Sequence, residues 1–168
     1  MKRKAITIIT ILFLAITVMA LFPLSVKAKA TKTYFTGTET WVEDIDPGTE
    51  WMSGKIYHLR GGVSLYRDVC TDERITGDTT VVFNLNLDVT TGRVSFWGTQ
   101  FTVSDVGGGF WEGTWTGKGH ADGSSSFRGV GHGRGLFEGL KVKYTIEFSP
   151  DPTEPGIYSG YILDPHGE

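Results

Sequence analysis

The chain has 168 residues, of which 39% are hydrophobic and 21% charged, and its formal net charge is −3. Four of its 16 basic residues fall within the first 27 positions; without them, 12 basic residues remain against 19 acidic ones, a net charge of −7. We therefore do not expect nucleic acid or an anionic membrane surface as a partner. Cys70 is the single cysteine, which excludes an intramolecular disulfide and leaves stability to packing.

The first 28 residues have the pattern of an export signal. Basic residues at positions 2–4 precede an uncharged, mainly apolar stretch of 20 residues, 5–24, and small residues follow it. This pattern predicts a signal peptide over residues 1–28, cleaved after Ala28 or Ala30, and a secreted or otherwise extracytoplasmic protein. The alternative is an uncleaved signal that stays as a membrane anchor, because 20 such residues can just cross a bilayer.

Residues 29–168 are long enough for a single domain, and their pattern is that of β-structure. Short alternating runs rich in Val, Thr and aromatic residues are separated by Gly, Asp and Pro clusters. We predict about eight antiparallel strands, at residues 33–42, 55–66, 79–88, 93–103, 109–119, 125–133, 137–148 and 156–163. They fit a small closed β-barrel or, alternatively, a two-layer β-sandwich. Glycines inside strands favour the barrel, because they allow the tight corners that closure needs.

Residues 79–88 and 93–103 form the clearest predicted hairpin. The first run alternates cleanly, with its apolar residues on one face. In the second run the alternation changes phase, since Val94 and Phe96 hold one parity and the apolar residues from Trp97 onward hold the other. This change predicts a β-bulge next to Trp97.

Six aromatic residues lie close together in the sequence between positions 96 and 115. Such rings fill a core by default, but they also line sites for flat apolar ligands or sugar rings. Trp111 and Trp115 share a strand face with several glycines, which can leave a concave apolar surface. We therefore predict Trp97, Trp111, Trp115 and Tyr144 as binding residues for a small apolar or aromatic ligand.

Glu138 is the candidate catalytic residue. It shares parity with the apolar face of residues 137–148, so an unbroken strand would turn its carboxyl into the core. Burial there would raise its pKa and make it a general acid or a ligand contact. The alternative is that Gly139 hosts a bulge that turns Glu138 outward.

No cofactor and no metal site is predicted. His120, Asp122 and His132 could approach one another across a hairpin, but zinc and copper sites have closer His or Cys clusters. The glycine-rich run 129–135 lacks the spacing of a dinucleotide loop. Cys70 has no histidine near it in sequence, so we expect an inert thiol.

Several motifs give the chain a resemblance to known proteins. They are Arg74-Ile75-Thr76-Gly77, Asn84-Leu85-Asn86-Leu87-Asp88, Thr91-Gly92, Trp97-Gly98-Thr99, Trp111-Glu112-Gly113-Thr114-Trp115-Thr116-Gly117 and Gly131-His132-Gly133-Arg134-Gly135-Leu136-Phe137-Glu138-Gly139-Leu140. With them, residues 74–165 resemble a group of exported bacterial proteins without an assigned activity. The Gly-x-Gly-x-Phe-x-Gly pattern is also similar to that of the allene oxide cyclase and dirigent β-barrels. These resemblances imply a small barrel with a cavity and transfer no site residue.

Three functions of different classes fit these observations. The first is a binding protein for a small apolar or aromatic ligand, the second an allene-oxide-cyclase-like cyclase or isomerase, and the third a structural or surface-interaction protein with a filled core. A solvent-connected cavity above about 300 Å³ would favour the first two. A paired, desolvated carboxylate in that cavity would favour catalysis over binding alone. The sequence assigns no oligomeric state.

Overall fold

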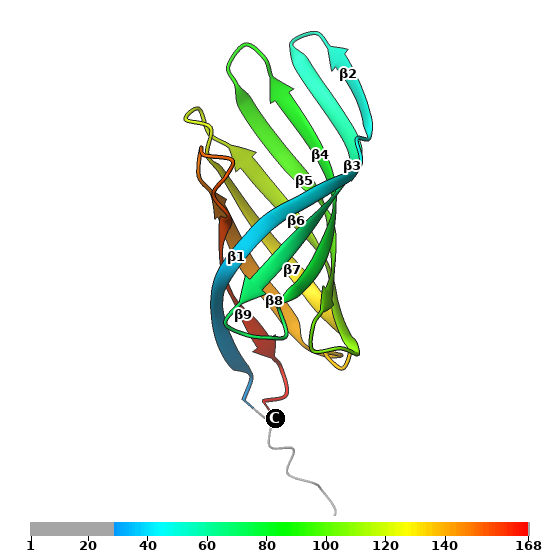
Figure 1. The fold of residues 1–168 in the computed structure, drawn as a ribbon, viewed down its shortest axis with the longest axis vertical. Coiled ribbons are helices and arrows are strands. Elements are labelled where there is room, and N and C mark those ends of the chain that lie inside the picture. Colours follow the sequence, from blue (N-terminus) through cyan, green and yellow to red (C-terminus); the bar gives the residue numbers. More distant parts are fainter. Residues whose placement is uncertain (1–28, 168) are drawn as a thin grey trace, which may run out of the picture.

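The computed structural model describes residues 29–167, which form one all-β structure (Figure 1). The predicted export signal over residues 1–28 lies outside the described residues. The strands are β1 (Thr31–Asp46), β2 (Thr49–Ser53), β3 (Ile56–Cys70), β4 (Gly77–Asp88), β5 (Arg93–Ser104), β6 (Gly109–Gly119), β7 (Ser125–Gly135), β8 (Lys141–Phe148) and β9 (Gly156–Asp164). The described part of the chain has no helix long and apolar enough to span a bilayer.

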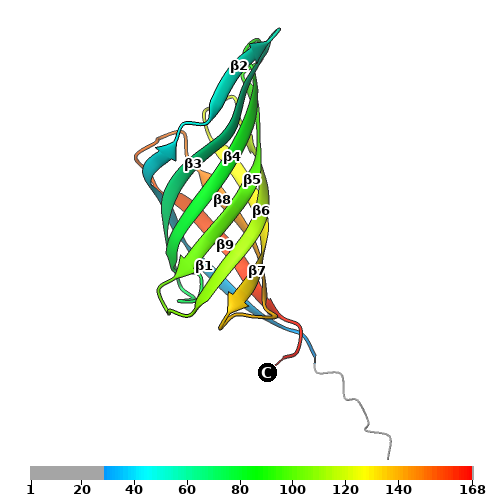
Figure 2. The same cartoon turned by 90° about the vertical axis from the view of Figure 1, so that its right-hand side faces the viewer.

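Eight of the strands close into an antiparallel barrel. The hydrogen-bonded order is β1-β9-β8-β7-β6-β5-β4-β3, and β1 pairs with β3 to complete the circle. The predicted closed barrel of about eight strands is confirmed, and the sandwich alternative is wrong. β2 lies outside the barrel and pairs with the start of β3, so this hairpin and the adjoining ends of β4 and β5 extend beyond the other strands (Figures 1 and 2).

The glycines inside the strands make room for aromatic rings on neighbouring strands. In register, Trp115 of β6 lies opposite Gly129 of β7, which lies opposite Tyr144 of β8. A Cβ atom on Gly129 would lie 2.2 Å from the Tyr144 ring, and one on Gly117 would lie 2.2 Å from the Phe127 ring. The proposed role of these glycines in tight corners is therefore wrong at these positions, since they provide space on the inner wall.

The predicted bulge next to Trp97 is absent. β5 pairs with β4 without a register shift from Arg93 to Ser104. Gln100 and Thr102 of β5 are buried on the inner face, whereas Phe101 is 42% exposed outside. The alternation is therefore regular, and the apparent change of phase arose because this strand turns polar side chains into the barrel.

One end of the barrel is closed by a loop and by stacked rings. Ile75, in the loop between β3 and β4, is only 2% exposed. Trp111 donates a hydrogen bond from its indole Nε1 to the Arg74 carbonyl, 2.8 Å away, and its ring stacks on Phe137 at 5.2 Å between centroids. The start of β1 and the end of β9 lie at this closed end (Figure 1).

Candidate functional site

The structure separates the four predicted ligand-binding residues. Trp115 and Tyr144 line a cavity inside the barrel. Trp111 is 1% exposed and belongs to the packed closed end. Trp97 is turned to the outer wall, where the Arg60 guanidinium carbon lies 4.6 Å from its ring centroid. Of the four predicted residues, therefore, Trp115 and Tyr144 alone can contact a ligand inside the barrel.

Glu138 does not point into the barrel. The chain turns between β7 and β8, Gly139 takes a φ of +88°, and β8 begins only at Lys141. The Glu138 side chain is 67% exposed, and it lies 3.4 Å from the Arg134 guanidinium. The expectation of an interior acid at this position is wrong, because the turn interrupts the strand on which the parity argument depended.

Two other acids, Glu39 and Asp68, do lie inside. They are direct neighbours across the β1–β3 pair that closes the barrel, and they are only 7% and 1% exposed. Side chains directly opposite each other in an antiparallel pair have Cβ atoms about 5 Å apart. The barrel therefore holds two carboxyl groups side by side in a buried environment, where both cannot easily be charged.

Asp68 belongs to a short chain of hydroxyl groups. The Thr79 hydroxyl donates to Asp68 Oδ2 at 2.6 Å and lies 2.8 Å from the Thr102 hydroxyl. Asp68 Oδ1 is buried and has no hydrogen-bond partner among the described residues. Burial raises the pKa of Asp68 to about 7, although the Thr79 hydrogen bond and the nearby Arg67 oppose this rise.

Glu39 lies between Asp68 and the cavity. Burial raises the pKa of its carboxyl well above the usual range, and the nearby Asp68 raises it further. Within residues 29–167 no side chain or backbone group donates a hydrogen bond to this carboxyl. Burial therefore favours the protonated form of Glu39, which offers an O–H donor and a carbonyl acceptor to whatever occupies the cavity.

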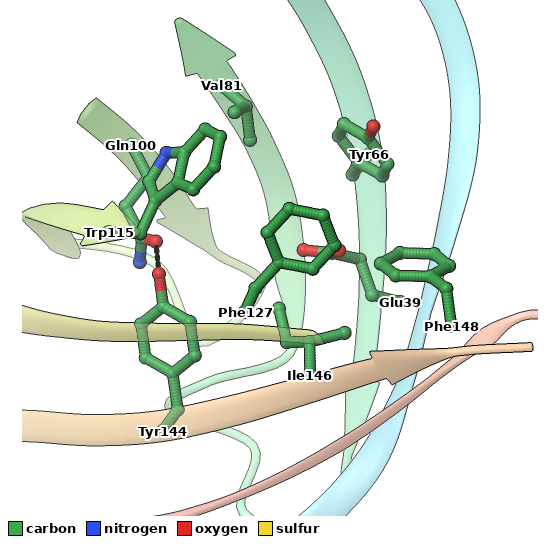
Figure 3. Close-up of a pocket in the computed structure, with 9 residues that line it drawn as sticks. All are labelled: Glu39, Tyr66, Val81, Gln100, Trp115, Phe127, Tyr144, Ile146 and Phe148. Carbon is green, nitrogen blue, oxygen red and sulfur yellow. Dashed lines mark hydrogen bonds between the residues drawn. The ribbon is translucent and has the colours of Figure 1, made fainter. Parts of the chain in front are cut away.

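The cavity has a volume of about 50 Å³ and is partly open to the outside. It is lined by Glu39, Tyr66, Val81, Gln100, Trp115, Phe127, Tyr144, Ile146 and Phe148, so seven of the eight barrel strands contribute to it (Figure 3). Trp115 is held by a 3.2 Å hydrogen bond to the Thr99 carbonyl, and the Tyr144 hydroxyl donates to Gln100. Figure 3 shows the Glu39 carboxyl directed among the labelled rings.

The size of this cavity limits its occupant. A buried water needs about 10–15 Å³ measured in this way, so 50 Å³ has room for roughly three to five waters. The cavity is far smaller than the roughly 300 Å³ typical of sites for drug-sized ligands. By the criterion of about 300 Å³, the cavity as it stands favours the filled-core alternative, and it leaves room only for a small molecule or for one end of a larger molecule.

The other candidate groups do not form a site. Burial, together with Asp68 and Glu39, raises the pKa of the Cys70 thiol to about 12, which makes it a poor nucleophile as expected. His120 lies 3.2 Å from the Ser126 hydroxyl on an exposed part of the surface. No three His, Cys, Asp or Glu side chains within residues 29–167 come together as metal ligands would.

Comparison with known proteins adds no function. No protein-family model matches the chain, and no curated protein matches it. The resemblances to exported bacterial proteins and to cyclase or dirigent barrels therefore stay predictions. A functional assignment has to come from the geometry of the barrel interior.

Sequence reasoning missed Glu39 and Asp68, although a signal for each was present. Glu39 has the parity of Phe35 and Gly37, and Asp68 has the parity of Tyr66 and Cys70, so each acid shares a face with apolar or small residues. Alternation by itself does not say which face is inside. Which face is inside depends on the pairing of β1 with β3, and these two strands pair only when the barrel closes.

Proposed function

We propose that this chain is an exported binding protein whose barrel interior takes a small, mainly apolar or aromatic ligand. Trp115, Phe127, Tyr144 and Phe148 supply the apolar walls, and Glu39 supplies the polar contact. The observation that carries the proposal is the Glu39 carboxyl, which is 7% exposed, borders the cavity and receives no hydrogen bond from residues 29–167.

One buried polar atom inside the barrel has no hydrogen-bond partner among the described residues. A buried polar group without a partner costs about 1–3 kcal/mol of stability. The barrel carries this cost at Asp68 Oδ1. The Glu39 carboxyl borders the cavity and has no partner among residues 29–167, so a ligand with a hydrogen-bonding atom can bond to it there. A carboxyl that borders an apolar cavity without a partner among the described residues supports a role in binding rather than in packing.

Acid–base catalysis of the cyclase or isomerase kind is a second candidate, favoured by the pairing of Glu39 with Asp68. A protonated carboxyl next to one with a pKa of about 7 can give a proton to a bound molecule and recover one from its neighbour. Conversion of a retained ligand by the wild type and not by Glu39→Gln would support this candidate.

Native mass spectrometry of the protein secreted by its own host tests the proposed binding. We expect a retained small molecule in the wild type and its loss in Glu39→Gln and in Trp115→Ala. Glu43→Gln, on the same strand but exposed, is the matched control and should retain the ligand. Equal retention by all variants, or a bare chain together with no uptake of small apolar probes such as phenol or toluene, would contradict the proposal.

A further inference from the structure

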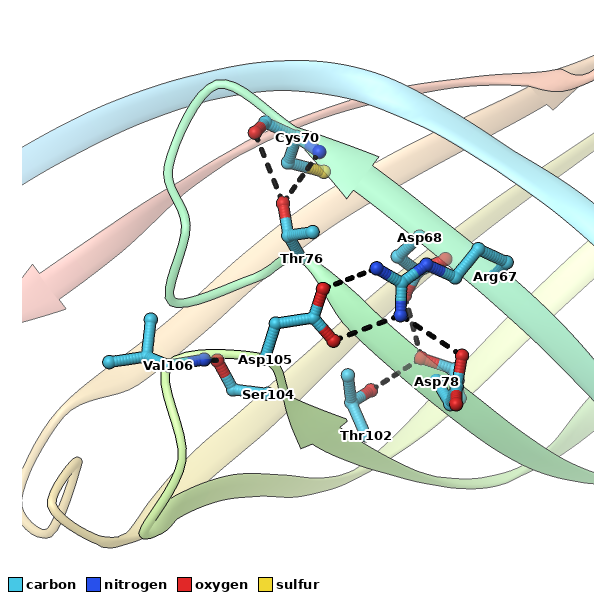
Figure 4. A network of polar contacts seen from close by, with 10 residues as sticks. Arg67, Asp68, Cys70, Thr76, Asp78, Thr102, Ser104, Asp105 and Val106 are labelled. Carbon is cyan, nitrogen blue, oxygen red and sulfur yellow. Dashed lines mark hydrogen bonds and ion pairs between the residues drawn. The ribbon is translucent and has the colours of Figure 1, made fainter.

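The interior of the barrel holds acidic side chains and no basic ones among the described residues. Among the described residues, the side chains turned inward include two acids, Glu39 and Asp68, and no Lys, Arg or His. Arg67 is next to Asp68 in sequence, but it points outward and its guanidinium bonds Asp78 and Asp105 (Figure 4). The protein therefore provides no cation inside the barrel to accompany the two acids.

The walls of the cavity have the chemistry of a cation site. Five aromatic side chains, Tyr66, Trp115, Phe127, Tyr144 and Phe148, surround the space beside Glu39. Trp115 and Phe127 meet edge to face at 5.6 Å between centroids, and Phe127 and Phe148 do so at 5.8 Å. The negative face of an aromatic ring attracts cations, and several rings around one space recognise organic ammonium groups.

We propose that the cavity takes the cationic head of a small organic ammonium compound, held by these rings and balanced by the Glu39–Asp68 pair. This inference rests on the proposed function and narrows its ligand to one chemical class. A volume of about 50 Å³ suits a head of about four or five heavy atoms, such as trimethylammonium or tetramethylammonium. Because the cavity is partly open, the rest of the ligand can extend toward solvent.

Binding of a cation would be coupled to loss of a proton. A positive charge beside Glu39 favours ionised carboxyls, so the pair should release protons when the ligand enters. The other titratable or charged groups around the pair are Tyr66, Cys70, Tyr144 and Tyr158 inside and Arg67 and Asp78 outside. Burial raises the pKa of the three tyrosines and of Cys70, so these groups stay protonated at neutral pH and the released proton comes from the acids.

A pair of ligands with the same shape and different charge tests this inference. Isothermal titration compares choline with 3,3-dimethyl-1-butanol, in which a neutral carbon replaces the quaternary nitrogen. We expect choline to bind about tenfold more tightly at pH 8, and this preference should shrink at pH 5, where the pair is protonated. Titrations at pH 7 in buffers of different ionisation enthalpy should show proton release on choline binding.

Variants separate the roles of the two acids. Glu39→Gln and Asp68→Asn should remove the preference for choline, while the exposed Glu43→Gln should keep it. Circular dichroism and thermal unfolding confirm that each variant folds, which we expect because each removes a buried acid. Equal binding of the two ligands, or binding of neither up to about 100 mM, overturns the ammonium inference. Equal binding of the two ligands leaves the proposed function standing. That function is tested separately, by ligand retention in the secreted protein and its variants and by uptake of apolar probes.

Discussion

The two halves of the barrel interior differ in how their aromatic and polar groups are partnered. At the closed end, Trp111 stacks on Phe137, its indole N–H has a carbonyl partner, and Ile75 covers them. Around the cavity, rings of similar size surround Glu39, a carboxyl that receives no hydrogen bond from the described residues. The first arrangement is what packing alone would produce. The second leaves a buried carboxyl without a partner among the described residues, and this is the half in which we propose that a ligand binds.

Trp111→Ala should produce the largest loss of stability. The side chain is 1% exposed, and its removal leaves a large hole beside Phe137 and an unused carbonyl at Arg74. We expect the free energy of unfolding to fall by about 3–5 kcal/mol, measured by urea denaturation. Trp97→Ala on the outer wall is the matched control and should cost much less. Similar losses for both tryptophans would contradict the distinction between inner and outer rings.

The pH dependence of stability tests the buried pair. Burial raises the pKa of Asp68 to about 7 and raises that of Glu39, so the folded protein keeps these protons to higher pH than the unfolded chain does. The unfolded chain therefore ionises first, and the free energy of unfolding should fall by a few kcal/mol as pH rises from about 4 to about 8. Urea denaturation across this range measures the slope.

Asp68→Asn is the variant that identifies the source of this slope. It should flatten the decrease and make the protein more stable than the wild type at pH 8. Asp105→Asn is a control. The hydrogen bond from Arg67 lowers the pKa of Asp105, so the stability that Asp105 contributes is lost as pH falls, whereas the stability that protonated Asp68 contributes is lost as pH rises. A wild-type protein whose stability rises steadily from pH 4 to pH 8 would rule out a buried, protonated pair.

Gly129→Ala should have a moderate effect. The added methyl carbon would lie 2.2 Å from the Tyr144 ring, so the ring or the strand has to move. We expect a loss of about 1–3 kcal/mol in urea denaturation and a weaker affinity for cavity ligands, since Tyr144 lines the cavity. Val130→Ala, the next residue and outward-facing, should leave ligand affinity unchanged. An unchanged Gly129→Ala variant would show that the ring does not need the glycine.

Glu138→Gln should have the smallest effect. Its side chain is 67% exposed, and within residues 29–167 its only ion pair is a surface contact with Arg134. We expect no measurable change in the unfolding midpoint or in ligand retention. Loss of ligand in this variant would return Glu138 to the list of site residues.

The fold was largely predictable from the sequence, and the site was not. Local alternation predicts most strands because side chains in a strand point to opposite faces in turn, and abundant glycine favours the barrel. The inner acids escaped because their burial depends on β1 pairing with β3, two segments whose contact closes the barrel. The bulge predicted next to Trp97 was wrong for a similar reason. In β5 the polar Gln100 and Thr102 point into the barrel and apolar residues such as Phe101 point outward, which the alternation alone does not reveal. Glu138 was misplaced because a turn replaced the expected strand.

The position of the chain ends has a consequence for tethering. β1 starts at Thr31 and β9 ends at Asp164, and these residues pair at the closed end, opposite the extension formed by β2 and its neighbours (Figure 1). A chain held to a surface through its N-terminal segment would therefore have the closed end toward the surface and the extended end toward the surroundings. A fusion partner added at the C-terminus would likewise be attached at the closed end, away from the β2–β3 hairpin.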